Sequence, residues 1–134
     1  MLRPASFKLA SAVVLIVLAA FFVLQAQTAP APKYDKSSEV KVKGVIEDVK
    51  TGTDNTVHII LKNDKGSIDV TVAPEKFLKE MEITFAKGDA IEVLGSQLTV
   101  DGNPAMLARE VSHNGDIMTM RDEHGKPVWL GWIK

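Results

Sequence analysis

Apolar and polar residues alternate along most of the chain from Glu39 onward. A period of two is typical of strands that bury one face, so the pattern predicts strands at residues 39–49, 57–62 and 68–72. The phase of the alternation shifts near Gly44, where we expect the first strand to bend or bulge. Turn residues separate these three strands at positions 51–55 and 63–66.

A helical period replaces the alternation after the third strand. Phe77, Leu78 and Met81 recur at helical spacing, and Pro74 precedes them at a position where the first turn of a helix tolerates proline. We therefore expect a short helix over residues 74–82.

Alternation returns after the turn at Lys87-Gly88-Asp89. Short strands are predicted at residues 91–93 and 98–100, with a break between them at Gly95-Ser96. Asp101-Gly102 favours a type I′ hairpin that leads into a fifth strand. The remaining segments are that strand at 105–111, a turn at 113–116, an extended stretch at 117–121 and a turn at 122–127.

This order of elements predicts the fold class. Three strands, a short helix and two further strands are the arrangement of an OB-fold barrel. We expect residues 39–134 to form a mainly β domain, a five-stranded OB-fold-like barrel with a short helix between strands 3 and 4 and an extra C-terminal hairpin. A stretch of about 100 residues supports one core and leaves no room for a second domain.

The N-terminal segment has a different character. Arg3 and Lys8 precede an uncharged apolar run that begins at Leu9 and ends at Leu24. Basic residues stay on the cytoplasmic side, so the domain that follows is expected across the membrane. The run is longer than most signal-peptide cores and shorter than a spanning helix of about 20 residues. Residues 1–26 are therefore either a cleaved signal peptide or a retained signal-anchor helix.

Residues 27–38 are expected to be a Pro/Ala-rich linker, because proline disfavours helix at its own position and at the one before it. The barrel would then lie on the periplasmic side of the cytoplasmic membrane. It is either anchored there through the helix from Leu9 to Leu24 or soluble after cleavage.

Charge and cysteine content narrow the possible functions. Two of the 16 basic residues precede the apolar run, so the 17 acidic residues outnumber the basic ones in the exported part. This balance argues against a general nucleic-acid binder, which carries a basic surface. The chain has no cysteine, which excludes disulfides, thiolate metal sites, cysteine nucleophiles and a lipoprotein anchor on cysteine.

Three motifs carry a resemblance to known proteins: Lys87-Gly88-Asp89, Ala108-Arg109-Glu110-Val111, and the run from Arg121 to Trp129 (RDEHGKPVW). Through them, residues 39–129 resemble a group of small exported bacterial OB-fold proteins that are mostly labelled hypothetical or DNA-binding. A DNA-binding role implies bases stacked on aromatic side chains of strands two and three. Those strands contain no Phe, Tyr or Trp here, so nucleic acid is not the partner that we expect.

A weaker resemblance points to copper. Met118 and Met120 alternate in one strand, with His113 upstream and Trp129 downstream, and thioether and imidazole groups suit Cu(I). The set is similar to that of periplasmic OB-fold copper chaperones, which bind Cu(I) with two Met, one His and a nearby Trp. The position of the Trp departs from their pattern, and alternating methionines are more often barrel core. We expect no metal or other cofactor, with a copper site at His113, Met118 and Met120 as the alternative.

No catalytic set emerges from the spacing of residues. Ser67 and Ser96 lie in no nucleophile elbow, and the adjacent carboxylates at 47–48 and 122–123 would point to opposite faces of a strand. His58, on an outward face, and His124, in a turn, are expected to be solvated. The chain is therefore expected not to be an enzyme.

The apolar C-terminal run at 128–133 either covers the barrel, enters the membrane interface or docks a partner. If the run is free, Trp129 and Trp132 are the natural interface residues, and Arg121 is placed to position them. We expect a non-enzymatic accessory or structural subunit that binds other membrane or periplasmic proteins. The alternatives are a periplasmic Cu(I)-binding protein and a nucleic-acid or oligosaccharide binder.

Overall fold

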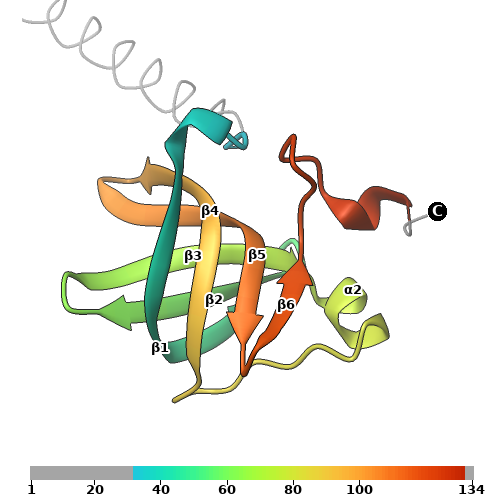
Figure 1. The fold of residues 1–134 in the computed structure, drawn as a ribbon, viewed down its shortest axis with the longest axis horizontal. Coiled ribbons are helices and arrows are strands. Elements are labelled where there is room, and N and C mark those ends of the chain that lie inside the picture. Colours follow the sequence, from blue (N-terminus) through green and yellow to red (C-terminus); the bar gives the residue numbers. More distant parts are fainter. Residues whose placement is uncertain (1–31, 132–134) are drawn as a thin grey trace, which may run out of the picture. The chain divides into compact units, whose positions relative to one another are not determined.

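Strands dominate the computed structural model, which describes residues 32–131 (Figure 1). The part from Tyr34 onward forms a unit of its own. The elements in chain order are η1 (Lys36–Ser38), β1 (Glu39–Thr51), β2 (Thr56–Asn63), β3 (Gly66–Pro74), α2 (Glu75–Glu80), β4 (Ala90–Val100), β5 (Asn103–His113), β6 (Asp116–Thr119) and η2 (Val128–Gly131). The predicted signal segment at residues 1–26 lies outside the described residues. Within residues 32–131 no helix has the length and apolar character needed to cross a membrane.

Five of the strands close into a barrel. The sheet runs in the order β3-β2-β1-β4-β5-β6, and a parallel pairing of β3 with β5 joins Asp69, Val70 and Thr71 to Ala105, Met106 and Leu107. This pairing closes the ring, while β6 pairs only with β5 and lies outside it. The predicted mainly β fold, a five-stranded barrel with a short helix between the third and fourth strands, is confirmed, and one extra strand, β6, stands where an extra C-terminal hairpin was predicted.

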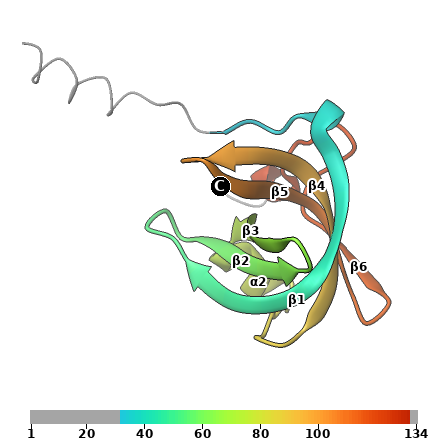
Figure 2. The same ribbon diagram turned by 90° about the vertical axis from the view of Figure 1, so that its left-hand side faces the viewer.

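The long first strand, β1, pairs with two different strands along its length and curves around the barrel (Figure 2). Its first half, from Glu39 to Val45, pairs with β4, and its second half, from Val45 to Thr51, pairs with β2. A Cβ atom at Gly44 would lie 2.6 Å from the carbonyl oxygen of Lys62, so glycine permits this close crossing. The register irregularity itself lies between Ile46 and Asp48. The bulge expected near Gly44 is thus three residues further along.

The fourth strand is continuous, so the predicted break at Gly95-Ser96 is wrong. A bulge between Leu94 and Gly95 shifts the register to β5 without ending the strand. Gly95 has no side chain to collide with the backbone of Leu107, which lies against it. Ser96 is buried, and its hydroxyl accepts a hydrogen bond from the backbone N–H of Asp35 at 3.0 Å.

The core fills the barrel and extends under α2. It is made by the inward residues of all five barrel strands together with Phe77 and Leu78 of α2 and Met120 beyond β6. The helix ends at Glu80, two residues before the predicted end. The predicted type I′ hairpin is confirmed by positive φ angles at Asp101 (51°) and Gly102 (78°).

The chain after β5 covers one end of this core. The extended stretch was expected to end at residue 121, but β6 ends two residues earlier, at Thr119. Arg121 then pairs with Pro127 as an isolated bridge, and η2 follows as a 3₁₀ turn.

Candidate functional site

Arg121, predicted to position an interface, lies between two aromatic rings. Its guanidinium carbon is 5.6 Å from the ring centroid of Tyr34 and 5.6 Å from that of Trp129, which is the geometry of a cation–π contact. Its Nη1 donates a hydrogen bond to the carbonyl of Gly125 at 2.9 Å. Its Nε is buried without a hydrogen-bond partner in the described structure. Burial therefore lowers the pKa of the Arg121 guanidinium.

Trp129 covers the barrel. Its ring stacks on Phe77 of α2 with centroids 5.8 Å apart and a tilt of 50°, and it packs against the core. The structure brings Arg121 and Trp129 into contact, with Trp129 covering the barrel, the first of the three roles considered for the C-terminal run. Trp132 lies outside the described residues. Leu130, which directly follows Trp129, is 55% exposed.

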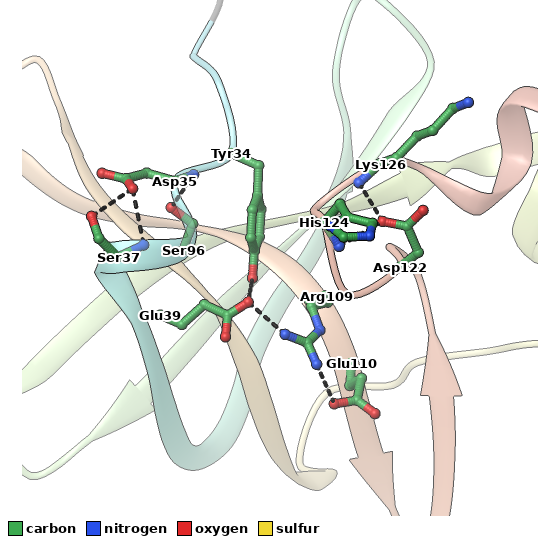
Figure 3. A network of polar contacts seen from close by, with 10 residues as sticks. All are labelled: Tyr34, Asp35, Ser37, Glu39, Ser96, Arg109, Glu110, Asp122, His124 and Lys126. Atoms are coloured by element: carbon green, nitrogen blue, oxygen red, sulfur yellow. Dashed lines mark hydrogen bonds and ion pairs between the residues drawn. The ribbon is translucent and has the colours of Figure 1, made fainter.

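A polar network joins the segment before β1 to β5 (Figure 3). The Tyr34 hydroxyl donates to Glu39 Oε1 at 2.7 Å, and Arg109 Nη1 donates to the same oxygen at 2.6 Å. Hydrogen bonds from Tyr34 and Arg109 lower the pKa of the Glu39 carboxyl, although partial burial opposes them. Burial and the neighbouring Glu39 carboxylate raise the pKa of Tyr34.

Sequence reasoning missed this network. Tyr34 falls inside the predicted linker, and Arg109 entered only as part of a motif. The available signal was that the chain's single tyrosine stands just before the first strand.

The RDEHGKPVW motif builds the turn that holds these groups. Asp122 Oδ1 accepts hydrogen bonds from the backbone N–H groups of His124 and Lys126, both at 2.9 Å (Figure 3). Gly125 has a φ of +83°, and a Cβ atom there would collide with the ring of Tyr34. His124 is exposed at 77% of its side chain, as predicted. The motif thus has a structural role, which is to place Arg121 and Trp129 over the barrel end.

A hollow of about 540 Å³ lies on another side of the barrel. Residues 40–43 of β1 form one wall, the β2–β3 hairpin at 63–68 forms another, and Gln97 and Pro104 complete the lining. In Figure 1 the β2–β3 and β4–β5 hairpins both project to the left of β1. No local pattern in the sequence predicts this hollow, because the hollow depends on where β2 stops relative to β1.

Two of the alternative copper residues, His113 and Met118, lie on the β5–β6 hairpin, and Met120 follows the end of β6. Val111 pairs with Met118 and His113 with Asp116, so His113 and Met118 share a face of this hairpin. Met120 is fully buried in the core, and Met118 packs partly buried against it. The Nε2 atom of His113 lies 3.7 Å from Asp89 Oδ2. Within residues 32–131 no three His, Asp or Glu side chains gather as a metal site would require.

His58 is not the solvated residue that was expected. Its side chain is 27% exposed, and its Nδ1 lies 2.9 Å from Asp69 Oδ1 and 3.5 Å from Thr71 Oγ1. Because acid and hydroxyl face the same ring nitrogen, the histidine does not connect them as a catalytic triad does.

Comparison with known proteins gives one family. The model of the MamS/MamX magnetosome protein family matches residues 38–118. This is a small bacterial family, as the resemblance predicted, although its description names no OB-fold group. No curated protein matches the chain.

Among solved structures, two of asparaginyl-tRNA synthetase from Pyrococcus horikoshii are similar. The complex with asparaginyl-adenylate has a TM-score of 0.48 at 11% identity and covers 57% of this chain and 19% of the synthetase. The second has a TM-score of 0.49 at 10% identity and covers 61% and 20%. The chain thus spans about a fifth of either synthetase. The family model covers more than half of the chain, from η1 through most of β6, and the chain therefore belongs to the MamS/MamX magnetosome protein family.

Proposed function

We propose that this chain is a non-enzymatic accessory protein of the magnetosome membrane, whose barrel binds other subunits of a larger assembly. The observation that carries the proposal is the family match over residues 38–118. The arrangement of His58, Asp69 and Thr71, which lacks the connectivity of a catalytic triad, supports a role without catalysis.

The proposal places the barrel on the side of the membrane opposite the cytoplasm. Support comes from Arg3 and Lys8 before the apolar run, since basic residues stay cytoplasmic during insertion. If the run from Leu9 to Leu24 is retained, it anchors the barrel close to the membrane surface.

The C-terminal end of the barrel is one surface for a partner in this proposal. Arg121 and Trp129 fix η2 against the barrel, and Leu130 projects from it with 55% of its surface exposed. An apolar side chain on a rigid support is a suitable interface anchor, because little conformational entropy is lost on binding.

The test is purification of the protein, with an unmodified N-terminus, from membranes of magnetosome-forming cells in mild detergent, followed by native mass spectrometry. The proposal expects intact residues 1–134 in fixed stoichiometry with other subunits. A Leu130→Asp variant should lose a partner that docks on η2, whereas Lys76→Asp, at an exposed position of α2, should keep it. A cleaved domain that is recovered alone and soluble would contradict the proposal.

A further inference from the structure

The first half of β1 has an unpaired edge. Its residues from Glu39 to Val45 pair with β4, but pairing with β2 begins only at Val45, opposite Lys62. In an antiparallel strand, alternate residues direct their N–H and C=O groups to opposite neighbours. Within the described structure no backbone hydrogen bond from a turn or loop reaches residues 40–44. This stretch therefore presents free backbone donors and acceptors toward the hollow.

The hollow beside this edge has the size of a binding site. Its volume of about 540 Å³ falls within the roughly 300–1,000 Å³ of ligand pockets. Val40 and Val42 on β1 and Ile68 on β3 line it and pack, partly buried, against the core. A strand laid along β1 would thus find an apolar strip for every second side chain.

The rim of the hollow is basic although the exported part of the chain is acidic. Lys41, Lys43 and Lys65 line it with a single acidic residue, Asp64. Lys43 forms one ion pair, in which its Nζ lies 3.7 Å from Glu92 Oε2, and its side chain is largely exposed. Lys41 and Lys65 form no ion pair within residues 32–131. Lysine on a strand edge discourages unselective pairing between sheets. It also favours an incoming strand that carries carboxylates at the facing positions.

We propose that an extended acidic segment of a partner protein binds in this hollow by adding a strand to the free edge of β1. The inference deepens the proposed accessory role, on which it rests, by naming the surface and the kind of partner. Backbone pairing with residues 40–44 would supply affinity. The alternation of Val40 and Val42 with Lys41 and Lys43 would select a segment in which apolar and acidic residues also alternate, apolar side chains inward and carboxylates beside the lysines.

The proposal can be tested with synthetic peptides and the full chain in mild detergent. The probe is a fluorescein-labelled peptide of alternating Glu and Val, and its binding is followed by fluorescence anisotropy. We expect it to bind, whereas alternating Lys and Val, or the same Glu and Val residues in two blocks, should bind at least about tenfold more weakly. Two further peptides carry N-methyl groups on every second residue, one on the odd and one on the even positions. Each lacks the amide donors along one edge of the strand, so at least one of the two should bind weakly.

Variants locate the site. The double substitution Lys41→Glu and Lys43→Glu should weaken binding of the Glu-Val probe by about tenfold or more. The control, Lys50→Glu with Lys76→Glu, makes the same charge change outside the hollow and should leave binding unchanged. Hydrogen exchange measured by mass spectrometry should slow in residues 40–44 when the probe is added.

Several results would overturn the inference. If both N-methylated registers bind as tightly as the unmethylated probe, strand addition is excluded. Equal binding of the block peptide would show attraction to charge alone. An oligodeoxythymidine that competes with the probe would assign the hollow to nucleic acid. A dimer that the two lysine substitutions disrupt would assign it to a second copy of the chain. These experiments use the purified chain. The accessory role is tested independently, by native mass spectrometry of the protein extracted from membranes.

Discussion

Gly125 is the residue on which the arrangement of the C-terminal end depends. Its φ of +83° disfavours any other residue, and its missing side chain makes room for the ring of Tyr34. Gly115 is a matched control, because its φ of +85° is similar but nothing lies within 4 Å of a Cβ atom there. We expect Gly115→Ala to lower the free energy of unfolding by about 1 kcal/mol and Gly125→Ala by about 3 kcal/mol, since overpacking adds to the backbone strain. Denaturant unfolding measures both, and equal losses would show that Tyr34 does not pack there.

Glu39 is expected to make stability depend on pH in the acidic range. The hydrogen bonds from Tyr34 and Arg109 lower its pKa in the folded state from the ordinary value of 4.5. A carboxyl whose folded pKa is lowered contributes stability that is fully present above the unfolded pKa and is lost as pH falls through the folded pKa. The difference in unfolding free energy between the native chain and Glu39→Gln should therefore be constant above about pH 6 and shrink below the ordinary pKa. The exposed Glu80→Gln serves as control, and a difference that persists undiminished in acid would refute the network.

At the scale of elements, η2 serves as a cover for the barrel through Trp129. The ring packs on Phe77 and Arg121, whereas Leu130 on the same turn is exposed. Trp129→Ala should lower the free energy of unfolding by about 2 kcal/mol, and Leu130→Ala should change it by less than about 0.5 kcal/mol. If thermal or denaturant unfolding shows the two variants to be equally mild, then η2 is a free tail and both residues are available to a partner.

Substitutions of the methionines in and after β6 distinguish a role in the core from a role as Cu(I) ligands. Met120 is fully buried, so Met120→Leu should cost less than about 1.5 kcal/mol as a volume-conserving core substitution. We expect the native chain not to withdraw Cu(I) from a chromophoric chelator such as bicinchoninate. Competition for Cu(I) that disappears in Met118→Leu and Met120→Leu, but persists in Met106→Leu within the core, would establish the copper alternative.

At the scale of the whole molecule, the proposed topology places the barrel across the membrane from Arg3 and Lys8. An alkaline phosphatase fused behind the C-terminus should be active, because that enzyme needs disulfides, which form outside the cytoplasm. A fusion made directly after Lys8 should be inactive. Activity measured in whole cells distinguishes the two, and an inactive C-terminal fusion that is present in full length would place the barrel in the cytoplasm.

Local sequence patterns predict most of the barrel strands and their turns. The alternation from Glu39 onward sets one face of each strand toward a core, and Asp101-Gly102 sets the hairpin type, because these are local properties of a few residues.

Contacts between groups distant in the sequence are seen only in the folded chain. The contact of Tyr34 with Glu39, Arg109 and Arg121 joins segments up to about 90 residues apart, and no local period encodes such pairings. The bulges near Asp48 and Gly95 follow from how neighbouring strands cross, so they fell beside the predicted positions or within a predicted break. The free edge of β1 and its hollow exist because β2 stops at Asn63 while β1 continues, which is a property of register and not of either strand alone.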